Sequence, residues 1–343
     1  MRKLTLSLLC AALSAACGPP GQDPDGGSPD GGARPCANAC ACAERGPPDY
    51  RGETAGTPSA SSSAEQTEGL TRANRWRTAS GLAPIHANAQ VEDAALRHAQ
   101  FMASNASTCW PGAHSQVNNA GCQNFTGANP GARLVTSGYA WSAYGEVIDW
   151  ADTPTRAVDE WIWTVYHRKP FMRWEYVHMG YGRAQGPYNG RTAWHNVVDF
   201  ASPRSGERPT QPTSGFAVFP LPGQTDVPVG FRGDLEGPTP PAPGTLGAWP
   251  RGLSSGQVVS AHFVNAMFEV SEHLFYRSEP GGTRCEPVEH TFISRANDRN
   301  LMTSHDVFLY ANEALQPMTE YVTHLRGTVN GQPFDRTWAF TTR

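Results

Sequence analysis

Three polar residues in the first two thirds of the chain have the side-chain chemistry of a functional site. His114 lies in a short loop bracketed by two cysteines, Glu146 follows a glycine, and His167 ends an amphipathic segment. Two imidazoles and a carboxylate that converge could bind a divalent metal such as zinc, or act as acid and base. The sequence is interpreted as placing no Cys or Ser in a nucleophile motif such as G-x-S-x-G, so covalent catalysis is not expected.

A segment that begins at Thr153 must hold His167 in place. Thr153 can cap a helix whose first residue is Pro154, where the missing N–H costs nothing. An apolar stripe then recurs at helical spacing and must face a core: Val158, Trp161, Ile162 and Val165. Pro170 is expected to stop regular helix just after His167 and Arg168. The sequence therefore predicts a polar pair presented at the end of an anchored helix.

Arg168 is the fourth residue that we assign to the candidate ligand-binding cleft. Its guanidinium is expected to donate a charge-assisted bond to a carboxylate, and Glu146 and Asp159 are the candidate partners. Three further histidines of this region are interpreted as structural: His98, His178 and His195.

Length and composition predict two domains and irregular connections. The chain has 343 residues, of which 39% are hydrophobic and only 17% are charged, and its 35 Gly and 29 Pro indicate long irregular stretches. The formal net charge of −4 gives no basic surface, so nucleic acid is not an expected partner.

The first 17 residues have the pattern of an export signal. A basic Met1-Arg2-Lys3 precedes an apolar run that is too short to span a bilayer. The sequence before Cys17 resembles a bacterial lipobox, which predicts lipidation of Cys17 and attachment to a membrane. We therefore expect an outer-membrane or cell-surface lipoprotein, and simple secretion is the alternative.

Export makes disulfides permissible. Cys109 and Cys122 bracket one loop and are the expected pair. The closely spaced Cys36, Cys40 and Cys42 resemble a metal cluster, but no fourth ligand lies nearby in the sequence. Disulfides are the preferred interpretation, one of them reaching Cys285; spacing alone does not fix the pairing further.

Changes in composition predict the domain boundaries. Residues 18–63 are rich in Gly, Pro, Ser and Asp and read as a disordered tether. Helices are expected from Ala64 and after an Asn88 cap, and a hairpin is expected from two alternating runs, 175–183 and 192–200. The first domain is therefore placed at 64–202, with helices packed on an antiparallel sheet.

The C-terminal third reads as a β domain. A linker at 203–213 precedes short alternating runs at 214–343, and Asn330-Gly331 is typical of a hairpin turn. Tyr321 lies in a context that resembles the tyrosine corner of immunoglobulin-like sandwiches. We predict an α+β protein that ends in an immunoglobulin-like β-sandwich.

Five sequence blocks follow one another in the first domain: L-T-R-A-N-R-W-R from Leu70, A-H-S-Q from Ala113, G-E-V from Gly145, A-V-D-E-W-I-W-T-V-Y-H-R from Ala157 and M-G-Y-G from Met179. In these blocks the chain resembles the CAP superfamily, which includes cysteine-rich secretory proteins, antigen 5 and plant pathogenesis-related proteins. The match is most similar to bacterial SCP-like members and runs from about residue 70 to 200.

The resemblance implies an α-β-α sandwich with a cleft lined by two histidines and two acids. His114, Glu146 and His167 fall on three of these places. The fourth place, an acid in animal and plant members, is occupied by Thr164.

Three functions fit these observations. The preferred one is an exported binding module for an apolar, lipid, sterol or cell-envelope ligand, bound in the His/Glu cleft. The second is a metal-dependent hydrolase, a protease or a cell-wall enzyme, in which His114 and His167 hold zinc and Glu146 acts as base. The third is a structural or adhesive surface protein, in which the histidines form only a polar core network.

Overall fold

A computed structural model describes residues 38–46, 56–207, 216–263, 268–279, 282, 284–301 and 305–343. These residues belong to one unit, Ala37–Arg343. The predicted signal, the lipidation of Cys17 and the tether up to residue 37 lie outside the described residues. Within the described residues no helix combines the length and the apolar character needed to cross a membrane.

A four-stranded sheet forms the centre of the N-terminal domain. Its strands follow the order β1-β3-β4-β2, with the bounds β1 (His86–Ala87), β2 (Trp141–Asp149), β3 (His178–Tyr188) and β4 (Arg191–Pro203). β3 and β4 form the predicted hairpin around Asn189-Gly190, and both strands are longer than predicted.

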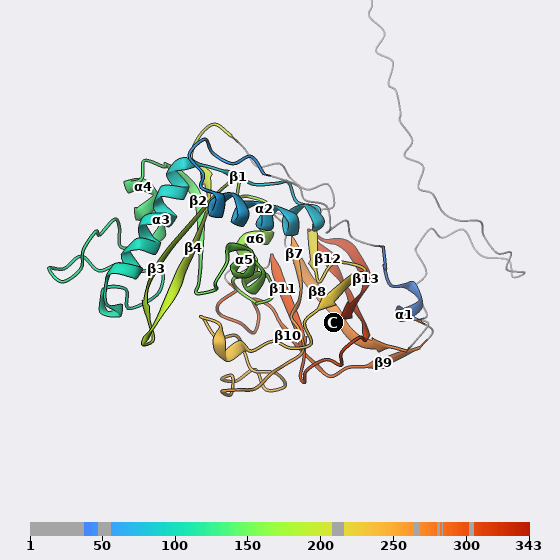
Figure 1. Cartoon of the computed structure of the whole chain (residues 1–343). Helices are drawn as coiled ribbons and strands as arrows, with labels where there is room; N and C mark the ends of the chain where they lie inside the picture. Colours follow the sequence, from blue (N-terminus) through green and yellow to red (C-terminus); the bar gives the residue numbers. More distant parts are fainter. Residues whose placement is uncertain are drawn as a thin grey trace, which may run out of the picture. The chain divides into compact units, whose positions relative to one another are not determined.

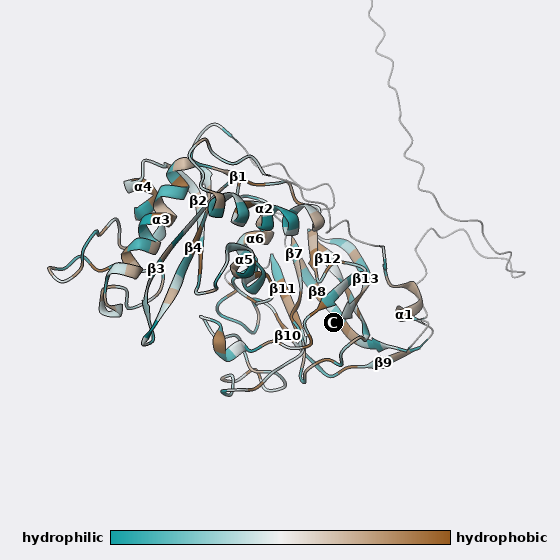
Figure 2. Cartoon of the chain, in the orientation of Figure 1, coloured by the Kyte–Doolittle hydropathy of each residue, from teal (hydrophilic) through white to brown (hydrophobic). Residues whose placement is uncertain are grey.

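Helices cover both faces of this sheet (Figure 1). They are α2 (Ala64–Ala79), α3 (Ala89–Ser104), α4 (Pro130–Thr136), α5 (Pro154–Ile162) and α6 (Arg168–Met172), with a 3₁₀ turn at Ser107–Cys109. α3 and α4 lie on one side, and α2, α5 and α6 lie on the other. The predicted α-β-α arrangement is therefore present. Figure 2 shows mainly hydrophilic residues on the sides of α2 and α5 that are in view.

The predicted helix starts are confirmed, but one helix end is wrong. The Asn88 side chain accepts from the N–H groups of Gln90 and Val91, and Thr153 caps α5. α5 ends at Ile162, before the last residue of the predicted apolar stripe. A second short helix, α6, then contains Pro170, because proline is tolerated in the first turn of a helix.

The C-terminal domain is a sandwich of two sheets with strand orders β10-β11-β7-β5 and β6-β13-β12-β8-β9. The strands are β5 (Phe216–Phe219), β6 (Gln224–Val227), β7 (Val259–Phe263), β8 (Phe268–Ser278), β9 (Cys285–Pro287), β10 (His290–Ile293), β11 (Asp306–Ala311), β12 (Glu320–Val329) and β13 (Gln332–Thr342). In chain order these correspond to the A-B-E-D and G-F-C sheets of immunoglobulin domains, with an added strand at two edges. The Tyr321 hydroxyl accepts a bond of 2.8 Å from the Gln316 N–H, the geometry of a tyrosine corner.

The expectation of a disordered stretch across 18–63 is wrong for residues 38–46. Helix α1 (Ala39–Cys42) is joined to the sandwich by a disulfide between Cys40 and Cys285. Beyond it, Arg45 forms an ion pair of 2.8 Å with Glu320. A covalent bond and an ion pair therefore order a segment that composition alone assigns to the tether. Cys42 is also disulfide-bonded, and the described cysteines thus follow the disulfide interpretation.

Candidate functional site

The structure brings His114 and Glu146 together. Glu146 lies on β2, and its side chain is 1% exposed. One carboxylate oxygen accepts a hydrogen bond of 2.8 Å from His114 Nδ1, and the other accepts one of 2.5 Å from Arg133 Nη2. The His114 side chain remains 47% exposed. The result is a charged cluster beneath the surface with a single ring at the solvent.

Arg133 is a member of this cluster that sequence reasoning missed. It projects from α4, whose start is fixed by the Asn129 cap and by a proline in the first turn. Its side chain is fully buried, and it also donates to the His114 carbonyl over 3.1 Å. The N-P-G-A-R sequence predicts a helix start here, but nothing in its spacing predicts a partner thirteen residues away.

The Arg133 guanidinium keeps Glu146 ionised. Burial alone would raise the pKa of the Glu146 carboxyl. Burial is the largest single effect, but the charge of Arg133 and the smaller contributions of His98 and His114 together outweigh it and hold this pKa well below its usual range. The cluster therefore contains a buried ion pair with two donors on one carboxylate.

His98 supports the loop that carries His114. It is fully buried on α3, and its Nε2 donates to the Ala113 carbonyl over 2.8 Å. Its Nδ1 accepts from the Gln116 side-chain amide over 3.0 Å. Burial lowers the pKa of His98 to about 4, so the ring is neutral at pH 7. This agrees with its interpretation as a structural histidine.

The loop itself has the predicted covalent tie. Cys109 and Cys122 form a disulfide across it. Within the loop, the Gln116 side chain bonds to both the N–H and the hydroxyl of Thr126. A disulfide, His98 and a side-chain bridge therefore fix the backbone on both sides of His114.

The contacts of His167 lie in a different place. Its Nδ1 is 3.4 Å from an oxygen of Glu236, and its backbone N–H donates to the same oxygen over 3.1 Å. Glu236 lies between β6 and β7 of the sandwich and has a side chain that is 1% exposed. It also accepts from the N–H groups of Val165 and Tyr166. None of the hydrogen bonds or ion pairs found among the described residues joins His167 to His114 or Glu146.

The expected partner of Arg168 is also wrong. Arg168 is fully buried and donates to the Ile162 carbonyl, to Ser260 Oγ over 2.7 Å and to the Val258 carbonyl over 3.0 Å. Among the described residues it bonds to no carboxylate, because the sandwich supplies neutral acceptors. The other candidate partner, Asp159, pairs with Arg72 instead. Without a carboxylate in contact, burial lowers the pKa of Arg168 to about 9, and its head cannot reach a ligand in solvent.

The family of this segment can now be identified. Residues 70–200 match the model of the Cysteine-rich secretory protein family, CAP. This part of the chain is a CAP domain. Among solved structures, an extracellular protein containing a SCP domain from Bacillus anthracis str. Ames is similar, with 19% identity over 40% of each chain and a TM-score of 0.31. No curated protein matches the chain.

The CAP domain contains a second buried acid near Glu146 that sequence reasoning missed. Thr164, at the fourth family place, bonds only to the Trp161 carbonyl in the contacts that the structure gives for its side chain. Asp199 of β4 lies directly opposite Glu146 in the sheet and is fully buried. The alternation of β4 could have indicated its face, but its partner depends on the register between two strands that are fifty residues apart.

Two other histidines of the CAP domain have structural surroundings, as predicted. His178 bonds to the Tyr139 hydroxyl over 2.8 Å and lies 3.1 Å from Glu207. His195 is fully buried, edge-on to Trp110.

Ser260, His262 and Asp306 form a chain of hydrogen bonds that resembles a hydrolase triad. Ser260 Oγ is 2.8 Å from His262 Nε2, and His262 Nδ1 is 2.9 Å from Asp306 Oδ1. All three residues are buried, at 1%, 4% and 1% exposure, and Ser260 also accepts from Arg168. This chain therefore connects the CAP domain to the sandwich and gives a substrate no access to the serine.

The prediction that no serine lies in a G-x-S-x-G motif is wrong, because Ser254 lies in one at Gly252–Gly256. The nucleophile elbow of that motif is a strand-to-helix turn. Ser254 lies in an irregular connection instead, and its hydroxyl points to the Ser255 carbonyl. The motif at Ser254 therefore lacks the geometry of a nucleophile elbow.

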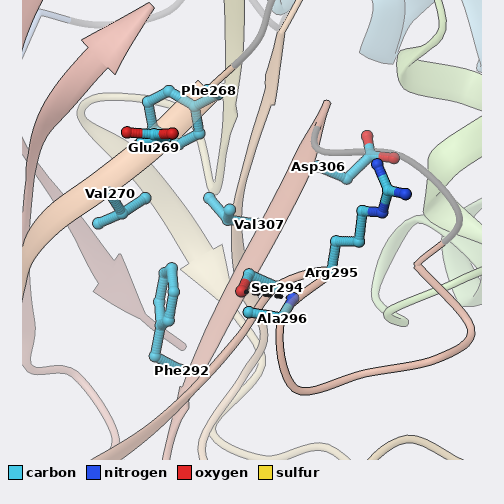
Figure 3. A pocket seen from close by; sticks show the side chains of 9 residues that line it. All are labelled: Phe268, Glu269, Val270, Phe292, Ser294, Arg295, Ala296, Asp306 and Val307. Atoms are coloured by element: carbon cyan, nitrogen blue, oxygen red, sulfur yellow. Dashed lines mark hydrogen bonds between the residues drawn. The ribbon is translucent and has the colours of Figure 1, made fainter.

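An apolar cavity of about 440 Å³ lies in the sandwich, apart from the His114 cluster (Figure 3). Phe268, Val270, Phe292 and Val307 supply its apolar wall. Arg295 and Asp306 lie together at one side of it in Figure 3.

The His114 cluster fits a divalent metal poorly. Both Glu146 oxygens already accept bonds from His114 and Arg133, and the guanidinium charge repels a second cation. In the described part of the chain no group of three or more His, Cys, Asp and Glu side chains is arranged for a metal ion. We therefore derive no chemical step through zinc here.

Proposed function

We propose that this chain is an exported binding module whose CAP domain takes an apolar or cell-envelope ligand beside His114. The observation that carries the proposal is the contrast in burial within one cluster. The His114 side chain is 47% exposed, whereas the side chains of Glu146 and Arg133 are 1% and 0% exposed. A ligand can reach the His114 ring from solvent, whereas the charged groups that orient the ring are shielded from water.

The hydrogen bond to Glu146 determines what His114 offers to that ligand. A carboxylate only accepts hydrogen bonds, so His114 Nδ1 carries a hydrogen. Nε2, which is directed away from the carboxylate, is then the ring nitrogen that a ligand can reach. A hydroxyl group is a suitable hydrogen-bonding partner for it. We therefore propose a ligand with a hydroxyl group, such as a sterol or an envelope sugar.

Exposed aromatic side chains supply apolar contact area near the ring. Tyr144 lies two residues before Glu146 on β2, so both side chains point to the same face of the sheet. Phe125 adjoins Thr126, which bonds to the His114 loop. Each of the two rings is 36% exposed. A hydroxyl group beside an apolar body matches this combination.

The N-terminal signal supports a place for this function outside the cell. Residues 1–17 have the pattern of an export signal, and lipidation of Cys17 would attach the protein to a membrane. Disulfides at Cys40–Cys285 and Cys109–Cys122 suit an oxidising compartment.

Binding of sterol-containing vesicles and of soluble peptidoglycan fragments tests the proposal, with a protein that begins after Cys17. His114→Ala should weaken binding of the accepted probe at least tenfold while the fold is retained. His86→Gln, a partly buried histidine of the same domain, is the matched control. A folded wild type that binds neither probe contradicts the proposal and favours the adhesive role.

A zinc titration of the wild type and of the same variants distinguishes the binding module from the metal-dependent hydrolase. The cluster predicts no stoichiometric zinc binding that depends on His114. If zinc does bind, and His114→Ala and His167→Ala each abolish it, the two histidines share a metal and hydrolysis of peptide and cell-wall substrates becomes the function to assay.

A further inference from the structure

Asp199 and Glu146 form a pair of buried carboxyl groups. They are direct partners in the antiparallel register of β2 and β4. Residues directly opposite each other in such a pair have side chains on the same face, with Cβ atoms about 4.5–5.5 Å apart. The Asp199 side chain is completely buried, with an exposed fraction of 0%. The two acids therefore meet inside the protein.

Only one of the two acids has donors for a negative charge. Glu146 accepts bonds from His114 and Arg133, as described above. Neither oxygen of Asp199 meets a donor among the described residues. A buried carboxylate without donors is strongly unfavourable. The negative charge therefore belongs on Glu146, and Asp199 must be neutral.

We infer that Asp199 keeps its proton at neutral pH and donates it to Glu146, as a positioning residue for the His114 site. With this proton between them, the two carboxyl groups attract each other instead of repelling. Glu146 then has three donors, from β4, α4 and the His114 loop. The cluster thus contains a second acid, although Thr164 occupies the fourth position, which is acidic in other family members. This second acid, Asp199, lies on a strand and is protonated.

The surroundings of Asp199 agree with this proton. Its other strand neighbour is Gly180 of β3, which offers no side chain, and the backbone of α3 packs against that glycine. The charged or titratable groups that face the pair are Arg133 from α4, His98 from α3 and His114 from the loop. Burial, together with the charge of Glu146, raises the pKa of Asp199 well above its usual range, and Arg133 offsets only part of this.

Burial also excludes a direct chemical role of the Asp199–Glu146 pair on a ligand. Both carboxyl groups lie beneath His114 and Arg133 and have no path to a substrate at their present exposure. The pair therefore does not act as an acid and a base on a ligand. Its effect is indirect: it fixes the Glu146 carboxylate, which fixes the tautomer of His114.

The variant Asp199→Asn tests whether Asp199 is protonated, because an amide can donate to Glu146 as the protonated acid does. Above about pH 4 the unfolded chain releases the Asp proton that the folded chain keeps. This proton alone makes the unfolding equilibrium constant rise about tenfold per pH unit, until the pH passes the pKa of the folded state. We expect this rise in the wild type from pH 7 up to the pH at which Asp199 ionises in the folded state, and a rise about tenfold smaller per unit in Asp199→Asn over the same pH range.

Asp149→Asn is the matched control. Burial raises the pKa of Asp149 to about 7, so its own contribution fades at the start of this pH range. The control should therefore keep the wild-type slope above pH 7. An Asp199→Asn slope equal to that of the wild type overturns the inference.

A direct measurement guards against a variant that fails to fold. In wild-type protein with ¹³C-labelled Asp, the Asp199 carboxyl carbon should show the protonated chemical shift at pH 7. An ionised signal at pH 7 overturns the inference. Both measurements use protein without ligand, so failure of the proposed binding function leaves their outcomes unchanged.

Discussion

Arg168 of the CAP domain donates through Nη1 to Ser260 Oγ of the sandwich, at 2.7 Å and out of contact with solvent. The bond continues through His262 to Asp306, and Lys169 lies 3.8 Å from the same Asp306 carboxylate. The residue that the sequence assigns to a ligand cleft is thus a link between two domains. The CAP domain and the sandwich share a buried polar network.

Ser260→Ala should destabilise the protein through this link. The change removes one acceptor of a buried guanidinium and leaves an Arg168 N–H without a partner. An unsatisfied buried donor costs about 1–3 kcal/mol, and more when it is charged. Urea unfolding of the wild type and the variant at pH 7 measures the difference. Ser271→Ala, at an exposed serine, should change the free energy of unfolding by less than about 0.5 kcal/mol.

Glu236→Gln should also weaken the contact between the domains. The Glu236 carboxylate accepts three backbone N–H groups, those of residues 165, 166 and 167. An amide has one acceptor oxygen, so at least one of these buried N–H groups loses its partner, at a cost of about 1–3 kcal/mol.

Urea unfolding at pH 7 checks this expectation as well. Glu269→Gln is a suitable comparison, because Glu269 is an exposed acid of the sandwich. Equal stability of Glu236→Gln and wild type would show that the carboxylate does not hold the segment before α6.

The sequence predicted the elements of the CAP domain well because their signals are local. The Asn88 and Thr153 caps, the turn at Asn189-Gly190 and the loop cysteines each depend on residues close together in the chain. The same is true of His114 and Glu146, whose places the family motifs identify separately.

The remaining partners depend on contacts that no local pattern encodes. Arg133 and Asp199 reach Glu146 only through helix packing and strand register. His167 and Arg168 instead contact Glu236 and Ser260, which belong to another domain. Motif reading of one domain cannot include acceptors that a later domain provides. The ordered segment 38–46 has the same cause, since Cys285 lies 245 residues away from Cys40.

Gly180→Ala should unfold the CAP domain or destabilise it severely. A Cβ atom at this position of β3 would lie 2.2 Å from the backbone carbonyl carbon of Val91 on α3. Backbone atoms cannot move aside cheaply, so the helix must separate from the sheet, and overpacking of this kind costs about 1–3 kcal/mol or more.

Gly237→Ala provides the control for this prediction, because no atom lies within 4 Å of its added Cβ. Circular dichroism and thermal unfolding of the two variants compare them. A Gly180→Ala protein as stable as Gly237→Ala would contradict the close approach of α3 to the sheet.

His98 should make the protein lose stability in acid. Its pKa is about 4 in the folded protein, because of burial, and about 6.5 in an unfolded chain. Between these values the unfolded chain binds the proton that the folded chain excludes, so stability is complete above about pH 6.5 and falls as the pH drops towards 4. The total loss is on the order of 3 kcal/mol. Asp199 acts in the opposite direction over the same range, because its proton is held by the folded state.

The two effects are separated by comparing each variant with the wild type at every pH. His98→Gln can keep a bond to the Gln116 amide and removes the titrating ring. The stability difference between wild type and His98→Gln should shrink by on the order of 3 kcal/mol between pH 6.5 and 4. His86→Gln should show no such trend. A difference that stays constant with pH means that His98 is already protonated in the folded state, and the neutral hydrogen-bond pattern beneath His114 is then wrong.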